Sequence, residues 1–249
     1  MNHQRPCRED ARDPAPWSNG AQAIGVPPFA DVLADTHRVM RRAGSTLKLE
    51  GEVAGGHYVL FSGWLAVAKS MLDGHRQIVD VVLPGGFLDA VSADLCTSVV
   101  EIEALTDVSY AAIPRQDWQR LLRERPDLAR ASDGSVRAAM SRMSARMLRL
   151  GKGSADSIVA FALCELCLRS TGGGLSEGWA YHIPMTQQQL GDFCGLSAVH
   201  MCRTLQRFRR DDILELRAPM RMVIRDLPAL AAIAEIDPPV LRQQIVPAA

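Results

Sequence analysis

The segment that begins at Thr186, TQQQLGDFCGLSAVHMCRTLQRFRRDDILEL, constrains the fold more than any other part of the chain. Thr186 and Gln189 have the spacing of a capping box. In this motif the side chain of each residue accepts a hydrogen bond from the backbone N–H of the other, which has no partner within the helix. Gly195 permits a sharp backbone turn, and Ser197 is a good residue to cap a second helix. The pattern from Thr186 to Leu214 therefore predicts two short helices joined by a tight turn.

The second predicted helix has an apolar and a polar face. Met201, Leu205 and Phe208 share the apolar face, which is expected to pack inward. A helix with an exposed basic face fits the major groove of DNA. Ile213–Leu216 and Met222–Ile224 predict a short wing hairpin around Pro219. The residues expected to contact DNA lie at the start of the first helix and on the outer face of the second: Thr186, Gln187, Gln188, Ser197, Ala198, Val199, His200, Arg203, Gln206 and Arg207.

Charge is distributed unevenly along the chain. The 249 residues carry 28 Lys and Arg against 28 Asp and Glu, so the formal net charge is zero. Met185–Arg225 nevertheless contains seven arginines against four acidic residues, and a local basic face is what DNA phosphates require. The Arg203 fork suits O6 and N7 of guanine, and a helix start such as Thr186–Gln188 favours phosphate contacts. The alternatives are a helix pair that only packs, and a winged helix that contacts proteins.

Residues 41–113 have the composition of short strands separated by turns. Tyr58–Lys69 and Gln77–Leu83 are rich in β-branched and aromatic residues, and Asp73-Gly74 between them favours a hairpin. Many short strands at regular spacing predict an antiparallel barrel or jelly roll. With the helices that follow, the fold class is expected to be α+β.

The middle of the chain is expected to be helical. Pro114 and Pro126 suit first helical turns, where a missing N–H costs nothing. Apolar residues then recur at intervals of 4, 3, 4 and 3, at Val136, Met140, Met143, Met147 and Leu150. Such a seam either packs on its own domain or pairs with the same helix of a second subunit; the polar opposite face favours pairing. Gly151 and Gly153 predict the helix end and a hinge, and Ser154–Arg169 a new amphipathic helix.

Residues 44–233 resemble the Crp/Fnr superfamily of bacterial regulators. The resemblance rests on GSTLKLEGE from Gly44, YVLFSGW from Tyr58, DGHRQIVDVVLPGGF from Asp73, ALTDV from Ala104 and, most specifically, the helix-turn-helix. It implies an N-terminal antiparallel β-roll or jelly-roll sensor, a long dimerisation helix and a C-terminal winged helix-turn-helix. It also implies a two-fold dimer on a palindrome, with half-sites about 10 bp apart.

The organisation that follows has five parts. They are a flexible N-terminal tail (1–28), a cyclic-nucleotide-binding-like sensor (29–125), the dimerisation helix (126–151), the winged helix-turn-helix domain (152–235) and a C-terminal tail (236–249). The expected partners are double-stranded DNA with a palindromic operator, a second copy of the chain and RNA polymerase. The N-terminal residues 1–20 lack an export signal and no apolar run could span a bilayer, so a cytoplasmic location without membrane contact is expected.

Two positions of the second helix depart from the family pattern. Ser197, His200 and Arg203 match positions at which the family contacts bases and phosphates. Ala198 and Val199 stand where its best-known members have an Arg-Glu pair. Valine cannot accept a hydrogen bond from cytosine but suits the methyl group of thymine, so an altered half-site is expected.

The sensor lacks what a cyclic nucleotide needs. No Lys or Arg occurs from Gln77 to Pro114, a stretch with six acidic residues, and burying a phosphate diester without a cation is costly. Control by cAMP is therefore not expected. Cys7 alone stands where the iron–sulfur branch has several cysteines, and haem binding through His57 or His75 has no support. No cofactor is expected.

The remaining cysteines allow one regulatory alternative. Cys164 and Cys167 form a CxxC pattern on a helix and are interpreted as small core residues. Cys202 adjoins Arg203, so its oxidation would place bulk and charge at the DNA groove; a redox-responsive regulator is therefore an alternative, as is a regulator that acts through protein contacts. Gly172–Gly174 lacks the Lys-Ser/Thr of a phosphate loop, and no enzymatic activity is expected.

Overall fold

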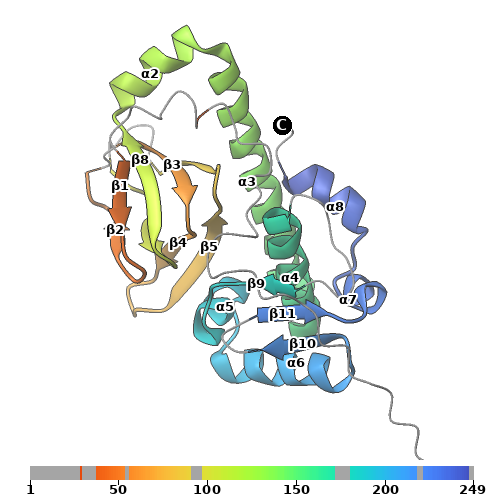
Figure 1. Ribbon diagram of the computed structural model, residues 1–249. Coiled ribbons are helices and arrows are strands. Elements are labelled where there is room, and N and C mark those ends of the chain that lie inside the picture. Colours follow the sequence, from red (N-terminus) through yellow and green to blue (C-terminus); the bar gives the residue numbers. More distant parts are fainter. Residues whose placement is uncertain are drawn as a thin grey trace, which may run out of the picture.

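The computed structural model describes residues 29, 38–53, 56–90, 97–171, 180–217 and 221–246, and Figure 1 shows a β-roll and a C-terminal domain joined by a long helix. The predicted N-terminal tail and Cys7 lie outside the described residues. The roll consists of two four-stranded sheets with strand orders β1-β8-β3-β6 and β2-β7-β4-β5. Its strands are β1 (Arg38–Arg41), β2 (Thr46–Lys48), β3 (His57–Ser62), β4 (Leu65–Ser70), β5 (Arg76–Val82), β6 (Phe87–Asp89), β7 (Glu101–Ala104) and β8 (Val108–Ile113).

The interior of the roll is filled by side chains from both sheets. Tyr58 and Tyr110, which are buried, place their rings 6.0 Å apart, and Leu65, Val67 and Ile102 pack in the same cluster. The hairpin predicted at Asp73-Gly74 is confirmed, because β4 pairs antiparallel with β5 across that turn. The alternation of the strands thus supplies the roll with its own core.

Two helices follow the roll, as the prolines predicted. Helix α2 (Arg115–Glu124) begins after Pro114 and buries Trp118. Helix α3 (Pro126–Lys152) has 27 residues, which corresponds to a length of about 40 Å. It ends before Gly153, whose backbone is extended, so the predicted end at residue 151 differs by one residue. Figure 1 shows α3 running between the roll and the last helix, α8.

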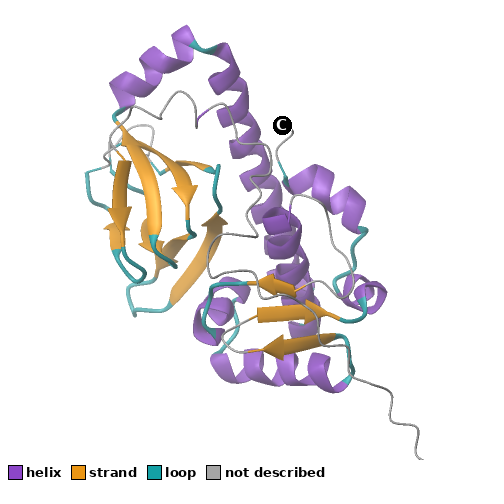
Figure 2. Cartoon of the chain, viewed as in Figure 1, coloured by secondary structure: helices purple, strands orange, loops and turns teal. Residues whose placement is uncertain are grey.

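The C-terminal domain surrounds a small antiparallel sheet of order β10-β11-β9, which Figure 2 shows among helices. Its elements are α4 (Ala155–Thr171), β9 (Ala180–His182), α5 (Gln187–Cys194), α6 (Ala198–Arg210), β10 (Leu214–Arg217), β11 (Arg221–Ile224), α7 (Leu227–Ile233) and α8 (Pro238–Ile245). The predicted wing is confirmed as the β10–β11 pair; its tip at residues 218–220 lies outside the described residues.

Three predictions about this domain were wrong. Helix α4 is not amphipathic, because every residue from 159 to 169 is buried; it is the central helix of the domain. The expected C-terminal tail contains α8, which Asp237 caps and whose first turn holds two prolines. Its Leu241 and Ile245 are buried, so this segment is part of the domain. Nor is Gly151–Gly153 a free hinge, since one apolar core joins Ala68 and Ile78 of the roll to α4.

Candidate DNA-binding interface

Helix α5 begins at the predicted capping box. The Thr186 N–H donates to Gln189 Oε1 at 2.9 Å, and the Gln189 N–H donates to Thr186 Oγ1 at 3.1 Å. Thr186, Gln187 and Gln188 are exposed at this helix start, and Gln188 Nε2 donates to Asp192 Oδ1 at 2.9 Å. The three side chains expected to approach phosphates therefore lie together at one helix N-terminus.

The turn between α5 and α6 requires glycine. Gly195 has a φ of 64°, in the left-handed region, and a Cβ atom there would lie 2.8 Å from Leu150 Cδ2 of α3. Ser197 then caps α6, its Oγ accepting from the His200 N–H at 3.3 Å. The His200 ring Nδ1 lies 3.2 Å from the same oxygen. The turn and cap fix α6 against α5 as the sequence predicted.

The two faces of α6 separate as expected. Met201, Leu205 and Phe208 are buried, and so is Thr204, which the sequence pattern did not mark. The outer face carries the remaining predicted contacts: Val199, His200, Arg203, Gln206 and Arg207 are exposed, and Ala198 and Cys202 are half-buried. The structure thus brings the predicted DNA-contacting residues onto one side of the α5–α6 pair.

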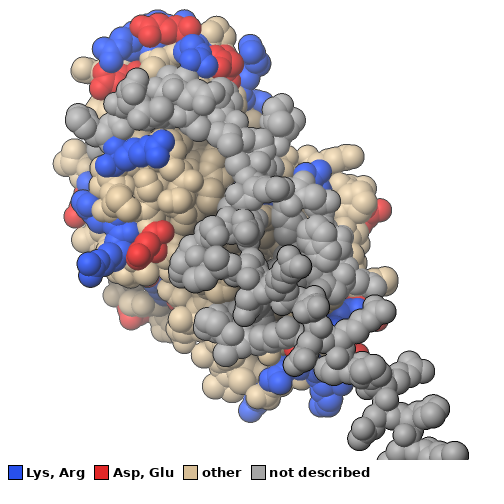
Figure 3. Space-filling model, in the orientation of Figure 1, with Lys and Arg blue, Asp and Glu red and all other residues tan. Residues whose placement is uncertain are grey.

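The arginines of α6 differ in whether they form ion pairs. Arg207 Nη1 lies 2.5 Å from Asp156 Oδ2 of α4, and Arg210 pairs with Asp211 at 3.3 Å. Arg203 is exposed and makes no hydrogen bond or ion pair with another described residue. Figure 3 shows basic side chains at the edge of the molecule where α6 lies. Among the described residues Arg209 is likewise exposed and without such a partner, so Arg203 is the one of the two that lies in the N-terminal half of α6, where a base edge is approached.

The predicted dimer seam lies on the open side of α3. Val136 is 51% exposed, Met140 69%, Met143 45%, Met147 71% and Leu150 45%. Within one chain the seam is therefore largely open. Packing on its own domain, which was the alternative interpretation, is seen only at Leu150, which lies against the α5–α6 turn. The opposite face of α3 is polar, as expected, but its Arg142 and Arg146 are buried against other elements of the same chain.

The cysteines and histidines have distinct environments. Cys164 and Cys167 are buried core residues, as interpreted, and burial raises the pKa of Cys164 to about 12. Cys202 is half-buried on the outer side of α6, and Gln206 Nε2 donates to its Sγ at 3.4 Å. His57 is buried and packs against the rings of Phe87 and Trp118, which also stack on each other. In the described part of the chain no three His, Cys, Asp or Glu side chains gather as metal ligands.

Sequence reasoning missed a buried ionic cluster between the roll and the C-terminal domain. Asp80 of β5 pairs with Arg142 of α3 at 2.7 Å, and Glu165 of α4 pairs with Arg146 of α3 at 3.1 Å. The signal was available, since Asp80 interrupts the apolar stretch IVDVVL and Glu165 the apolar stretch FALCELCL. A charge inside an apolar run needs a partner, but the sequence does not show which.

These features define a class of protein: a β-roll, a long helix with an open apolar seam, and a winged helix-turn-helix with a basic outer face. The family described as "Cyclic nucleotide-binding domain" matches residues 38–125, and the "Crp-like helix-turn-helix domain" matches residues 159–233.

No described helix is both long and apolar enough to cross a membrane.

Comparisons with individual proteins point to the same family. The chain is 31% identical over 175 residues to the nitrogen fixation regulation protein FixK of Bradyrhizobium diazoefficiens, covering 70% of this chain and 72% of that protein. It is 28% identical over 222 residues to FixK of Azorhizobium caulinodans, covering 86% and 87%. The FixK2 structure from Bradyrhizobium japonicum shares the fold with a TM-score of 0.71 at 23% identity, over 81% of this chain and 98% of that one. The chain belongs to the Crp/Fnr family of transcriptional regulators, whose members are DNA-binding proteins and not enzymes.

Proposed function

We propose that this regulator binds a palindromic operator as a homodimer, with the two α6 helices in successive major grooves. The exposed α3 seam carries the dimer part of the proposal. Met140 and Met147 are 69% and 71% exposed, and apolar side chains repeated at heptad spacing are stable in water when a second helix covers them. A two-fold dimer presents α6 twice, which matches a palindrome. RNA polymerase is proposed as the further partner of the bound dimer.

The base contacts follow from the outer face of α6. Arg203, which pairs with no other described residue, is proposed to donate its fork to guanine, while Val199, 59% exposed one turn earlier, meets a thymine methyl group. Ala198 cannot contribute an arginine contact. The half-site is therefore proposed to differ from that of family members with an Arg-Glu pair at these two positions.

Operator binding is proposed to be independent of cAMP. The stretch from Gln77 to Pro114 contains no Lys or Arg, so it offers no cation for a cyclic phosphate. Tyr58, Tyr110 and Leu60 occupy the interior of the roll. Three arginines do reach β5, but they belong to α3 and α4 and are engaged by Asp80.

Selection from random DNA, followed by binding measurements at several salt concentrations, tests this function. We expect a palindrome, a steep fall of affinity with salt and no change on adding cAMP. Arg203→Ala should weaken binding by about 10- to 100-fold and relax the preference at one base pair per half-site. Arg120→Ala, an exposed arginine of α2, is the matched control and should bind normally. Recovery of the standard cAMP-receptor half-site would contradict the proposed readout; a shallow salt slope without sequence preference would favour protein contacts instead.

A redox response through Cys202 is a second candidate. Among the described cysteines Cys202 is the one that is not buried, and it lies on the same helix face as Arg203. Oxidation there would obstruct the groove contact. Peroxide should abolish operator binding by the wild type and spare Cys202→Ser; equal loss by both proteins would rule the candidate out.

A further inference from the structure

The ionic cluster between the two domains gathers charges from three elements. Asp80 of β5 accepts from Arg142 Nη2 at 2.7 Å and from Arg146 Nη2 at 2.9 Å, both on α3. Arg169 of α4 lies 3.4 Å from the same carboxylate and 3.1 Å from Glu165 of its own helix. Every Asp, Glu, Lys or Arg that is buried in the described part of the chain belongs to this cluster.

The electrostatics make Asp80 the centre of the cluster. Burial alone would raise the pKa of Asp80, but the charges of Arg142, Arg169 and Arg146 outweigh it and hold this pKa well below its usual range. The cluster contains three arginines and two carboxylates, an excess of one positive charge. Removing the Asp80 charge would leave a single carboxylate for three buried guanidinium groups, which favours separation of the elements that carry them.

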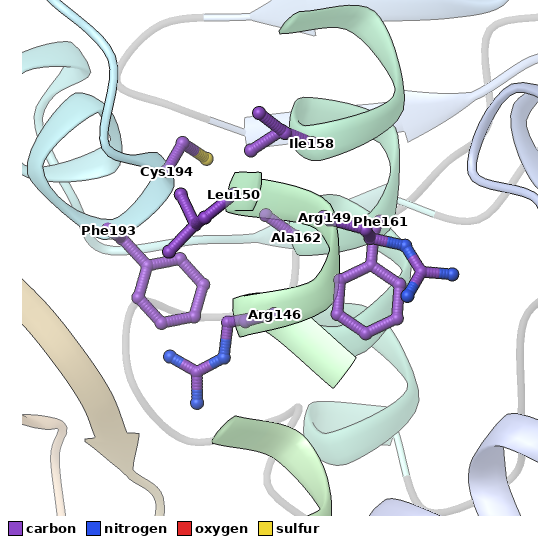
Figure 4. A pocket seen from close by; sticks show the side chains of 8 residues that line it. All are labelled: Arg146, Arg149, Leu150, Ile158, Phe161, Ala162, Phe193 and Cys194. Carbon is purple, nitrogen blue, oxygen red and sulfur yellow. The ribbon is translucent and has the colours of Figure 1, made fainter. Parts of the chain in front are cut away.

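The arginines also hold backbone groups. Arg146 Nη1 donates to the Val79 carbonyl at 2.6 Å, and Arg169 Nη2 donates to the Val81 carbonyl. The backbone of β5 is therefore hydrogen-bonded on both sides of Asp80. Arg142 Nη1 donates to the Ile245 carbonyl of α8 at 3.1 Å. Arg146 stacks on the Phe193 ring of α5 with 4.5 Å to its centroid, an arrangement that Figure 4 shows beside Leu150.

Helix α4 extends from this cluster to the DNA-binding surface. Arg169, near its end, meets β5, while Asp156, in its first turn, accepts from Thr204 Oγ1 at 3.3 Å and pairs with Arg207 at 2.5 Å. Thr204 and Arg207 lie on α6. A displacement of α4 relative to β5 would therefore move α6 with it.

We infer that Asp80 is a positioning residue: through Arg142, Arg146 and Arg169 it fixes the C-terminal domain on the roll and so sets where α6 lies relative to the dimer helix. The inference rests on the proposed dimeric function, because the position of α6 matters most when two copies must meet half-sites about one DNA turn apart. Asp80 is buried, and its ion pairs are with α3 and α4, not with α6. A displacement of β5 would be transmitted through this cluster to α6, and thereby to the bound DNA.

Asp80→Asn in the full-length protein tests the inference, with Glu103→Gln as matched control. Glu103 is a carboxylate of the same roll, paired with Arg76 at 2.6 Å and away from the cluster. Two DNA fragments are compared, a full palindrome and a single half-site. We expect Asp80→Asn to lose at least about tenfold in affinity for the palindrome while half-site binding stays within about twofold, since only the spacing of the two α6 helices is disturbed. Glu103→Gln should bind both fragments like wild type.

Hydrogen exchange gives a readout that does not depend on DNA. In the structure Gln77 of β5 and Phe193 of α5 are joined by a 3.2 Å hydrogen bond. In Asp80→Asn the backbone amides at this contact should exchange faster, whereas the exchange rates of amides within the roll core should not change. Unchanged exchange at this contact, or equal losses of affinity for palindrome and half-site, would overturn the inference. If wild type shows no preference for a palindrome, the proposed function fails while the exchange measurement still decides whether Asp80 positions the domain.

Arg169→Met keeps the inference testable if Asp80→Asn does not fold. It removes the excess positive charge and leaves two arginines with two carboxylates, so folding should be retained. It also removes the ionic link between β5 and α4, while their apolar contact remains. We expect the same selective loss for the palindrome, and wild-type binding to both fragments would contradict the assignment.

Discussion

Helix α3 has two faces that invert the usual arrangement of a surface helix. Its outward face carries Met140 and Met147, both more than two-thirds exposed, whereas its inward face carries Arg142 and Arg146, both 7% exposed. Soluble proteins ordinarily place methionine inside and arginine outside. Both faces belong to the same 27-residue helix, so the difference cannot come from local propensity and must reflect what each face contacts.

The contrast indicates two kinds of contact. An apolar seam is non-directional and is satisfied by any complementary apolar surface, which a second copy of the same helix supplies. A buried arginine needs acceptors in fixed places, and Asp80, Glu165 and the Val79 carbonyl provide them. We therefore propose that the seam serves dimer assembly, whereas the inward face with Arg142 and Arg146, here called the arginine face, joins the roll to the C-terminal domain.

The largest expected effect concerns the seam. Met143→Glu should place a charge in the proposed dimer contact, convert the protein to a monomer and lower operator affinity by about 1,000-fold, toward non-specific binding. Sedimentation and operator binding measure the two changes. Arg130→Glu, at an exposed position of α3 ahead of the seam, should stay dimeric. A dimeric Met143→Glu protein would show that α3 pairs elsewhere.

The arginine face should be most sensitive to loss of a buried partner. Glu165→Gln removes a fully buried carboxylate that pairs with Arg146 and Arg169, and the free energy of unfolding should fall by about 3 kcal/mol because buried guanidinium groups lose their partner. Glu101→Gln, which affects a part-exposed pair with Arg76, should cost below about 1 kcal/mol. Urea unfolding of both proteins checks this difference, and similar small effects would mean that the cluster is not a specific joint.

The two faces should also differ in their response to pH. The Asp80 pKa is lowered in the folded protein, so its contribution to stability is fully present above the unfolded value of about 4 and is lost as pH falls through the folded pKa. The stability difference between wild type and Asp80→Asn should thus be constant from neutral pH to about pH 5 and shrink below about pH 4. A seam variant such as Met143→Leu should show no such dependence. A difference that grows on acidification would contradict the assignment.

A smaller effect is expected at Arg149, the last arginine on the inward face of α3. Arg149 stacks on Phe161 with 3.8 Å to the ring centroid and donates to the Ala234 carbonyl at 3.0 Å. Arg149→Met keeps an apolar stem over the ring but loses the hydrogen bonds, so unfolding should become easier by about 1 kcal/mol. Arg137→Met, at an exposed position of α3, should change stability by less than about 0.5 kcal/mol. Equal values in thermal or urea unfolding would show that Arg149 adds nothing to the joint.

Local patterns in the sequence determined the helix-turn-helix and much of the roll. The capping box at Thr186, the left-handed turn at Gly195 and the cap at Ser197 were predictable because each depends on residues within one helical turn. The heptad spacing of the α3 seam was visible for the same reason. So was the separation of Met201 from Arg203 on opposite faces of α6, which follows from helical periodicity alone.

Tertiary structure alone decided how the parts are joined. Asp80 is 62 residues from Arg142, and Arg142 is 103 residues from Ile245, so no local pattern could pair them. The sequence also suggested a hinge at Gly151–Gly153 and a tail after residue 235, because glycine and proline are local breakers. Burial against α3 and α4 overrode that tendency: it made residues 238–245 a packed helix and closed the expected hinge into one continuous core.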